Sequence, residues 1–566
     1  MVPASVFLGL LDLIGVILLG TVGTLAFKVV SSDAKPTRLE VIFKSILPSN
    51  LSEVSLTLIV ALLAIFVLGS KTILQALINF KYIHFLARLE SNLASKLFGK
   101  IMKGQASTLN SNRFSEYQYA LTNGANRAIT GIVQSVISLL SDTITTIFMA
   151  ILAFYASPIA FATALLIFGF TYYLINGPIH NKSLKYGERA TTIYVSLTDR
   201  LLENFMGIKD VKVYRKEPEM IRNFDIEKRK LSENSQKINW ISSISRYFFE
   251  ISILFAGVGI IGVLVLTTDL RRTVTAVVIF MAIGYRLIPN IQRIQTAFVS
   301  LRIAEGSTSI FFEMLEKYPE VDDKDDMNLQ YMPEEDFEFV ELRHVFFSYP
   351  DNLHKPTLID ISISLKKNTT LAIVGESGSG KTTLADIIAG INKPTSGELH
   401  FNRGEGINSK GTKRPRTGYV SQTAALFGDD IYENIAFGSH SGHIDKVKID
   451  QILGELNLSF LAYNQLGEEA KNIRSDGTNL SGGEKQRIAI ARVQYADSDL
   501  VIFDEPTSAL DEDNKNKVIE YIQSISGIKT VIIVTHTLEL LDLCDSVLEI
   551  TQGKASFFGD TQSFRR

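Results

Sequence analysis

The stretch Gly375-Glu376-Ser377-Gly378-Ser379-Gly380-Lys381-Thr382 decides the fold of the second half of this 566-residue chain. An apolar run at 371–374 precedes it, and a helical pattern at 383–388 follows it. A strand that leads through a glycine-rich turn into a helix lets backbone N–H groups converge on phosphate oxygens, which the helix dipole also favours. The stretch therefore predicts a phosphate-binding loop, with Lys381 at the β- and γ-phosphates and Thr382 as a magnesium ligand.

A second stretch indicates which kind of nucleotide-binding domain this is. The segment at 480–487 reads LSGGEKQR and lies shortly before an apolar run at 500–503 and the pair Asp504-Glu505. In order and spacing, these segments resemble the ATP-binding cassette of the ABC transporter family, from about residue 337 to the C-terminus. Kinases and small GTPases share the phosphate loop but have no equivalent of the second stretch.

The composition limits what the rest of the chain can be. A net charge of −3 gives no electrostatic reason to expect nucleic acid as a partner. The hydrophobic fraction of 46% averages a very apolar first half with an ordinary second half. Cys544 is the single cysteine, so the chain cannot form an internal disulfide, which fits a reducing cytoplasm for the second half.

Six apolar runs in the first half are long enough to cross a bilayer, which argues against a soluble helical core. The segments after the second and fourth runs are rich in lysine and arginine, which places them in the cytoplasm by the positive-inside rule. We expect an integral, multi-pass protein of a bacterial inner or plasma membrane, with its ATPase domain in the cytoplasm. The runs lie at about residues 3–27, 54–79, 130–155, 158–178, 245–267 and 272–295.

Both cytoplasmic segments keep a helical apolar spacing, so the membrane helices are expected to continue beyond the bilayer. This resembles the exporter type of ABC transporter, in which short coupling helices at the tips of the extensions rest on the nucleotide domains. The tips are expected near Phe114 and near residues 211–214. The predicted fold is a helical transmembrane domain of about six helices with long cytoplasmic extensions, followed by an α/β P-loop ABC ATPase domain. The predicted bounds are 1–317 for the transmembrane domain, 318–336 for a polar linker and 337–566 for the nucleotide-binding domain.

Phosphoryl transfer from ATP to water requires held phosphates, a neutralising cation and an aligned water. Asp504 ends an apolar strand and is expected to hold Mg²⁺, and Glu505 is the candidate general base. The family resemblance adds Gln422, in a glutamine loop that links the γ-phosphate and the metal to the membrane helices, and His536, a switch histidine at the γ-phosphate. The predicted catalytic residues are Glu505, His536 and Gln422, and the predicted metal ligands are Thr382, Gln422 and Asp504.

The resemblance also implies that two chains complete each site. Ser481 and Gly483 are expected to offer a hydroxyl and a backbone N–H to the γ-phosphate held by the other subunit, and a D-loop at 508–511 crosses between the two nucleotide domains. A second half-transporter chain is therefore the expected partner, in a homodimer or, as the alternative, in a heterodimer. The residues expected to bind ATP are Tyr349, which stacks on adenine in the family, Gly375, Ser377, Gly378, Ser379, Gly380, Lys381, Thr382, Thr383, Ser481, Gly482, Gly483 and Asp511.

The sequence departs from the family pattern at a few positions. Glu484 stands where glutamine is commoner, and Pro506 stands where exporters frequently have alanine. Neither change removes a catalytic group. Residues 474–478 fit only loosely the exporter segment that contacts the partner's cytoplasmic loops, which puts that contact in question.

Ionisable residues inside membrane helices are costly, so they are candidate functional sites. Four stand out in the apolar runs: Asp12, Asp142, Glu250 and Arg286. The last three fall roughly 20 Å from the outer ends of their helices at 1.5 Å per residue, so they could share one layer. Together with Arg293 they are candidates for contact with a substrate, and a structural ion pair is the alternative.

Residues 285–294 of the sixth run look like the corresponding helix of PglK-like flippases, which move lipid-linked oligosaccharides. A guanidinium suits a diphosphate headgroup, and Arg286, Arg293 and Arg302 are expected to form a basic ladder. The predicted function is an ATP-driven exporter or flippase that works with membrane lipid and has a lipid-linked glycan as candidate cargo. A drug, lipid or peptide exporter of the same architecture, or one half of a heterodimeric exporter, is the alternative. An ATP-gated channel would need degenerate hydrolysis motifs, which this sequence does not have.

Overall fold

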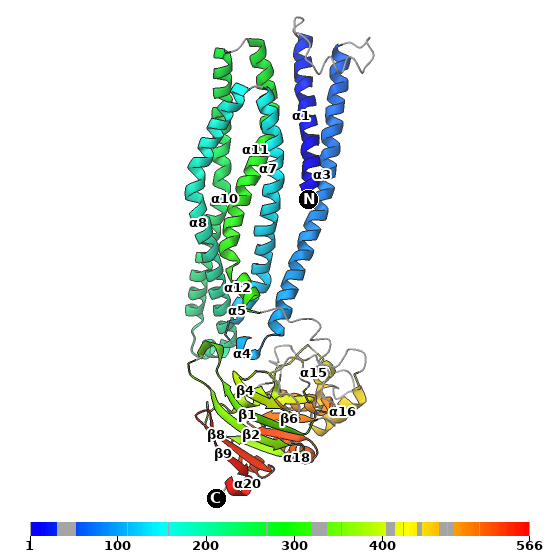
Figure 1. Cartoon of the computed structure of the whole chain (residues 1–566), viewed down its shortest axis with the longest axis vertical. Helices are drawn as coiled ribbons and strands as arrows, with labels where there is room; N and C mark the ends of the chain where they lie inside the picture. Colours follow the sequence, from blue (N-terminus) through cyan, green and yellow to red (C-terminus); the bar gives the residue numbers. More distant parts are fainter. Residues whose placement is uncertain are drawn as a thin grey trace. The chain divides into compact units, whose positions relative to one another are not determined.

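The computed structural model divides the chain into two compact units (Figure 1). The first contains Met1–Met102 and Asn112–Pro319, and the second contains Lys103–Ser111 and Glu320–Arg566. The predicted linker at 318–336 lies outside the described residues except for Tyr318, so the predicted domain bounds stay a prediction. The structure describes residues 2–30, 53–109, 111–156, 158–267, 270–318, 337–352, 354–402, 414–422, 424–428, 430–437, 444–462, 473, 480–508 and 510–564.

The first unit is built of long helices. Three of them, α3, α8 and α10, contain 50, 49 and 51 residues. At 1.5 Å per residue this is roughly 75 Å of helix, more than twice the ~30 Å hydrocarbon core of a bilayer. The membrane helices therefore continue well past the bilayer, as their apolar spacing predicted. The elements of this unit are α1 (Val2–Val30), α3 (Glu53–Met102), α5 (Phe114–Tyr119), the π-helical turn η1 (Ala120–Gly124), α6 (Ala125–Arg127), the π-helical turn η2 (Ala128–Val133), α7 (Gln134–Ala156), α8 (Pro158–Met206), α9 (Ile208–Val213), α10 (Glu217–Thr267), α11 (Leu270–Ser307) and α12 (Ser309–Lys317).

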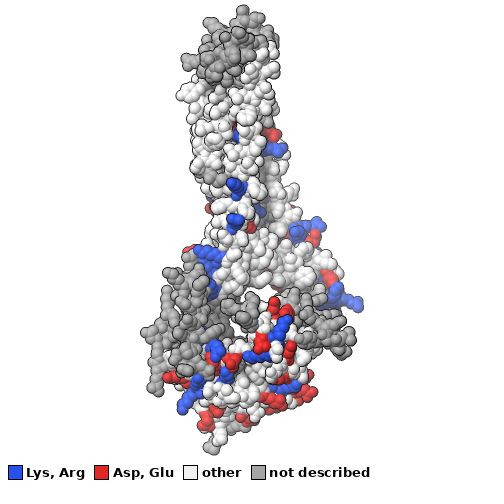
Figure 2. All heavy atoms as spheres, turned by 90° about the vertical axis from the view of Figure 1, so that its right-hand side faces the viewer, with Lys and Arg blue, Asp and Glu red and all other residues white. Residues whose placement is uncertain are grey.

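Four helices in the described part of the chain are long and apolar enough to cross a membrane. The first four predicted runs each coincide with one of these helices or with the shorter apolar helix Phe161–Leu174, and the fifth run overlaps one in part. The sixth run lies in α11, and most side chains of that run lie outside the described residues. On the face drawn in Figure 2, charged side chains are scarce along the helical unit and frequent on the second unit. The four helices cover Val6–Gly23, Val54–Met102, Phe114–Tyr155 and Glu217–Gly259.

The second unit is an α/β domain with two sheets, the class predicted for the ATPase core. A three-stranded antiparallel sheet has the order β2-β1-β4. A six-stranded sheet has the order β5-β6-β7-β3-β8-β9, in which β9 runs antiparallel to β8 and the other neighbours are parallel. The elements of this unit are α4 (Ala106–Leu109), β1 (Phe339–Phe347), η4 (Pro350–Asn352), β2 (Leu358–Lys366), β3 (Thr370–Val374), α14 (Lys381–Ala389), β4 (Ser396–His400), β5 (Thr417–Val420), α15 (Ile431–Ile435), α16 (Lys446–Glu455), η5 (Ser459–Leu461), α17 (Gly482–Ala496), β6 (Leu500–Asp504), α18 (Glu512–Ile525), β7 (Thr530–Val534), α19 (Leu538–Leu541), β8 (Ser546–Thr551), β9 (Lys554–Asp560) and α20 (Thr561–Phe564).

The alternation of side chains along each strand of the six-stranded sheet decides on which face the polar side chains of β5 and β6 lie. Leu500 and Ile502 of β6 belong to the core that includes α14, whereas Val501 and Phe503 belong to the core that includes α17 and α18. Because successive side chains of a strand point to opposite faces, Asp504 at the end of β6 lies on the α14 face. Tyr419 of β5 packs against the same core as α14, so both polar groups lie on one side of the sheet.

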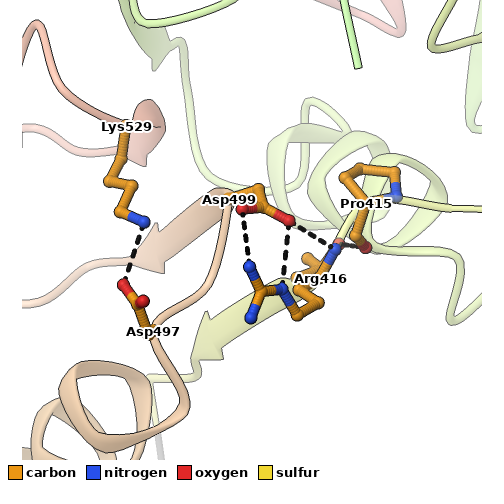
Figure 3. A network of polar contacts seen from close by, with 6 residues as sticks. Pro415, Arg416, Asp497, Asp499 and Lys529 are labelled. Atoms are coloured by element: carbon orange, nitrogen blue, oxygen red, sulfur yellow. Dashed lines mark hydrogen bonds and ion pairs between the residues drawn. The ribbon is translucent and has the colours of Figure 1, made fainter. Parts of the chain in front are cut away.

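An ion pair fixes β5 beside β6 at the amino ends of the two strands (Figure 3). Arg416 lies just before β5, and its Nε is 3.3 Å from Oδ2 of Asp499, which lies just before β6. The backbone N–H of Arg416 donates to the same oxygen at 3.3 Å. Asp499 is buried, whereas the side chain of Arg416 is 42% exposed. The ion pair is consistent with the register that sets Tyr419 opposite Ile502.

Short helices lie near both predicted tips of the cytoplasmic extensions. The helix α9 covers Ile208–Val213, in agreement with the tip predicted at 211–214. The helix α4 lies a few residues ahead of Phe114, which is the first residue of α5, so the position of the first tip stays a prediction. α4 belongs to the second unit, where the backbone N–H of Ser107 donates to Oδ1 of Asn392 at 2.9 Å.

Candidate functional site

The phosphate loop has a backbone that glycine adopts most easily. Gly375 and Gly380 have φ angles of +144° and +109°, which strain any residue with a side chain. A Cβ atom on Gly375 would lie 2.2 Å from the carbonyl oxygen of Ile550, and one on Gly380 would lie 2.8 Å from Leu358. Glycine is therefore required at both positions for conformation and for space, and the loop leads directly into α14.

Lys381 lies across this loop. Its Nζ donates to the carbonyl oxygens of Gly375 and Glu376 at 2.8 and 2.9 Å. Burial lowers the pKa of the Lys381 ammonium, while the charges of Glu505 and Asp504 act in the opposite direction. The ammonium is thus held against the loop, where it can bind an anion that the loop N–H groups also contact.

A hydroxyl and a carboxylate from different elements meet at the start of α14. Oγ1 of Thr382 donates to Oδ1 of Asp504 over 3.4 Å. Burial raises the pKa of the Asp504 carboxyl, the hydrogen bond from Thr382 lowers it, and the charge of Glu505 raises it again. Hydroxyl and carboxylate oxygens are ligands that Mg²⁺ prefers, and a cation would offset the cost of burying this carboxylate. Thr382 and Asp504 therefore fit the predicted metal site, whereas the amide of Gln422, the third predicted ligand, contacts Glu505.

Glu505 has a strained backbone that hydrogen bonds to its N–H and to its carbonyl oxygen hold in place. Its φ angle is +52°, in a region that residues with side chains seldom adopt. Its N–H donates to the carbonyl oxygen of Val534 at 2.9 Å. Its own carbonyl oxygen accepts hydrogen bonds from Nε2 of Gln486 at 2.9 Å and Oγ of Ser508 at 3.1 Å. Strain that the surroundings enforce in this way is typical of functional sites.

The carboxylate of Glu505 is the point where the predicted catalytic residues converge. Nε2 of Gln422 donates to its Oε2 at 2.8 Å, and Nε2 of His536 lies 3.5 Å from its Oε1. These residues follow β5, β6 and β7, which are neighbours in the sheet. A carboxylate held in this way can orient a water molecule and take its proton.

Tyr349 lies beside the first turn of α14. Its hydroxyl is 3.1 Å from Oγ1 of Thr383. Its ring meets Phe347 edge-on, with centroids 5.0 Å apart. The aromatic ring that was predicted to stack on adenine is therefore next to the residues predicted to bind phosphate.

The second motif begins a helix and caps it. Oγ of Ser481 accepts the backbone N–H of Glu484 at 3.2 Å, and the Glu484 carboxylate accepts the backbone N–H of Ser481 at 2.6 Å. This reciprocal pair is a capping box, so the unusual Glu484 stabilises the start of α17. The hydroxyl of Ser481 still has a proton to donate, and the helix N-terminus favours an anion. Asp511 caps α18 by accepting the N–H of Asn514 at 3.1 Å.

The two motifs are separate within one chain. Across the described ranges, no hydrogen bond or ion pair joins Ser481, Gly482 or Gly483 to residues 375–383 or to Tyr349. Ser481, Gly482 and Gly483 are therefore not joined to the phosphate loop of their own chain, although Gln486, further along the same helix, donates to the carbonyl oxygen of Glu505. The predicted partner segment at 474–478 lies outside the described residues.

Comparisons with known proteins show the family of this chain. The family model described as ABC transporter matches residues 358–508, and the model described as ABC transporter transmembrane region matches residues 17–285. An energy-coupling factor transporter ATP-binding protein from Mycoplasmopsis synoviae is 34% identical over 221 residues, which cover 38% of this chain and 80% of that protein. The chain belongs to the ABC transporter family.

Relatives that match both halves of this ABC transporter are more distant. The ATP-dependent lipid A-core flippase of Syntrophus aciditrophicus is 26% identical over 474 residues, which cover 82% of this chain and 76% of that protein. The structure of a bacterial Atm1-family ABC exporter with ATP bound aligns with a TM-score of 0.80 at 18% identity, over 99% of this chain and 95% of that one. The exporter fold is therefore confirmed, and the chain is an integral membrane protein that couples ATP hydrolysis to transport.

Some residues near the site of this transporter were not predicted. Gln486 lies in the signature helix and reaches the backbone of Glu505. The hydroxyl of Tyr419 donates to Asp386 at 3.1 Å and lies 3.5 Å from Asp504. The alternation of side chains along β5 and β6 places Tyr419 and Asp504 on one face of the sheet. This alternation could be used only once the two strands were known to be neighbours.

The charged residues predicted in the membrane helices form ion pairs. Arg293 lies 3.0 Å from Asp142, which joins α11 to α7. Glu250 pairs with Arg246 on the same helix at 3.1 Å. The structure thus brings Asp142 and Arg293 together but gives Glu250 a different partner. The side chain of Arg286 lies outside the described residues, so its role stays a prediction.

A further ion pair is buried between α1 and α3. Nζ of Lys71 lies 2.9 Å from Oδ2 of Asp12, and each side chain is 8% exposed. One helical turn along α1, a Cβ atom on Gly15 would lie 2.2 Å from Leu68, so the two helices approach closely. Asp12 was predicted as a candidate functional residue, whereas Lys71 was not recognised inside its apolar run.

Proposed function

We propose that two copies of this ABC exporter hydrolyse ATP at two composite sites and thereby move a lipid with a phosphate-bearing headgroup between the membrane leaflets. The ATPase part rests on one observation, the convergence of Gln422 and His536 on the carboxylate of Glu505. The cargo part rests on residues 285–294 of α11 and on the lipid flippase among the relatives. A drug or peptide exporter of the same architecture is the second candidate.

Each residue of the site then has a separate task. Lys381 and the loop N–H groups hold the β- and γ-phosphates. Thr382 and Asp504 hold Mg²⁺, which when bound withdraws negative charge from the phosphates. Glu505 orients the attacking water and takes its proton, while Gln422 keeps the carboxylate in place.

Two chains are required because Ser481 does not contact the phosphate loop of its own chain, although it is proposed to contact a bound nucleotide. The N-terminus of α17 offers a hydroxyl, backbone N–H groups and a helix dipole, and all of these favour a phosphate. The Ser481 hydroxyl of one chain would then contact the nucleotide held by Lys381 of the other. A homodimer with two identical sites is the simplest arrangement that satisfies both motifs.

Mixing two inactive variants tests this arrangement. Lys381→Ala removes the phosphate-binding ammonium, and Ser481→Arg blocks the signature motif, so each homodimer should be inactive. A mixed dimer keeps one intact site, so equal mixing with subunit exchange should restore roughly a quarter of wild-type phosphate release. If mass spectrometry shows mixed dimers but no activity returns, either both sites must be intact for turnover or the sites are not composite. Crosslinking across Ser508 and its partner separates these cases, and the absence of a crosslink would contradict composite sites.

The Arg286→Gln variant tests the cargo. A guanidinium binds diphosphate through paired, charge-assisted hydrogen bonds, which glutamine cannot replace. We expect lipids with a diphosphate-linked glycan to stimulate the wild-type ATPase in liposomes. In Arg286→Gln we expect the ratio of the ATPase rates with and without this lipid to fall towards one.

The matched control is Arg229→Gln, since Arg229 lies on α10, outside the predicted basic ladder, and pairs with Asp225 on the same helix at 2.7 Å. Stimulation in this variant should equal that of the wild type. A stable Arg286→Gln protein with undiminished stimulation would contradict the cargo contact. A fall in its thermal stability would instead indicate a structural ion pair, and stimulation by peptides or drugs alone would favour the second candidate.

A further inference from the structure

Tyr419 stands between two carboxylates of the nucleotide domain. Its hydroxyl donates to Oδ1 of Asp386 on α14 at 3.1 Å. The same hydroxyl lies 3.5 Å from Oδ2 of Asp504. One phenolic proton therefore faces two carboxylate oxygens that come from a helix and from a strand of the sheet.

The hydroxyl of Tyr419 acts as a donor because both of its neighbours are carboxylate oxygens, which accept hydrogen bonds. Burial raises the pKa of its hydroxyl far above the ordinary value, and the neighbouring charges of Asp386 and Asp504 raise it further. Burial also raises the pKa of Asp386 to about 6, although the hydrogen bond from Tyr419 opposes this shift. A poorly hydrated carboxylate without a donor is costly, so both acidic groups are stabilised by this hydroxyl.

The two oxygens of Asp504 are contacted from different sides. Thr382 contacts Oδ1 and Tyr419 contacts Oδ2, so together they limit rotation of the carboxylate. Thr382 and Asp386 are four residues apart on α14, which places them on the same face of the helix. The ion pair between Arg416 and Asp499 holds β5 beside β6, which keeps the Tyr419 ring at this position.

We propose that Tyr419, anchored by Asp386, positions the Asp504 carboxylate for the magnesium ion. This inference rests on the proposed role of Asp504 as a metal ligand. Neither Tyr419 nor Asp386 contacts the metal or the nucleotide in this proposal, so both are positioning residues. The loss of a hydrogen-bond partner of a metal ligand typically weakens metal affinity about 10–100-fold.

Metal binding by the full-length protein in lipid nanodiscs tests the inference. The first measurement is the Mg²⁺ concentration that gives half-maximal binding of a fluorescent, non-hydrolysable ATP analogue. The second is the electron paramagnetic resonance signal of bound Mn²⁺. We expect Tyr419→Phe to raise the half-maximal metal concentration about ten-fold, while saturating metal restores nucleotide binding.

Tyr521→Phe is the matched control. Tyr521 lies on α18, and its ring packs edge-on against Phe503, next to Asp504, with centroids 6.5 Å apart. Its hydroxyl makes no hydrogen bond among the described residues. The metal dependence of this variant should match the wild type, and an equal shift in both tyrosine variants would overturn the inference.

Two further comparisons separate the possible failures. Asp386→Asn keeps an acceptor for the Tyr419 hydroxyl and should stay close to the wild type, whereas Asp386→Leu should shift in the same direction as Tyr419→Phe. Equal metal dependence in the two Asp386 variants would overturn the anchoring role even if Tyr419→Phe does not fold.

The variant Asp504→Asn tests the metal ligand itself. If the half-maximal metal concentration rises in Asp504→Asn but not in Tyr419→Phe, only the positioning role of Tyr419 is overturned. If it does not rise in Asp504→Asn, the proposed metal ligand is overturned.

Discussion

Glu505→Gln will bind MgATP normally and hydrolyse it roughly 10²–10⁴-fold more slowly, because the amide cannot take a proton from the attacking water. The phosphate contacts are untouched by this change, since Lys381 is held by the carbonyl oxygens of Gly375 and Glu376. Glutamine is also close in shape to glutamate, so the strained backbone at φ +52° has the same support. Phosphate release by purified protein in nanodiscs measures hydrolysis, and an equilibrium binding assay measures the affinity for MgATP.

A second carboxylate provides the control for this variant. Glu520 is exposed on α18 and lies on a different element from Glu505, Gln422 and His536. The variant Glu520→Gln should hydrolyse ATP at the wild-type rate. Turnover in Glu505→Gln within a few-fold of the wild type would show that another group activates the water.

Lys71→Met will destabilise the helical unit by about 3–5 kcal/mol, the usual cost of leaving one member of a buried ion pair behind. The pair with Asp12 spans 2.9 Å and both side chains are 8% exposed, so water can do little to solvate the remaining carboxylate. The close contact between α1 and α3 at Gly15 and Leu68 leaves little space for the helices to move apart. The thermal unfolding midpoint in detergent and the yield of folded protein report this loss.

Two comparisons show whether the charge pair is responsible. Lys81→Met changes an exposed lysine on the same helix and should leave the midpoint unchanged. The double variant Asp12→Leu with Lys71→Met removes both charges and should recover much of the lost stability, because no unpaired charge stays buried. A Lys71→Met protein as stable as the wild type would mean that Asp12 is solvated or paired in another way.

Some of the site could be predicted because its chemistry lies in consecutive residues. The glycines at 375, 378 and 380 supply positive φ angles within one loop, and the Ser481 cap acts on the next turn of its own helix. Such features depend on local backbone geometry, which neighbouring residues largely determine. The apolar runs are equally local, since a helix that crosses the bilayer must be apolar along its own length and must form its backbone hydrogen bonds within itself.

Other parts could not be predicted because they depend on strand order. The sheet order β5-β6-β7-β3 differs from the order in the chain, so nothing in the sequence states that Gln422, Glu505 and His536 end adjacent strands. Their convergence was expected from a family resemblance, and geometry now accounts for it. The same strand order brings Tyr419 next to Asp504. The family resemblance did not predict this contact.

By itself, then, the sequence determined the phosphate loop, the signature helix, the membrane helices and the fusion of two unlike halves. Each of these follows from local conformation or from the hydrophobic effect along one segment. Only the tertiary structure decided which charges meet: Asp12 with Lys71, Asp142 with Arg293, and Asp386 with Asp504 through Tyr419. An isolated charge has many possible partners in a sequence, and packing selects one of them because a buried charge is stable only beside a complementary group.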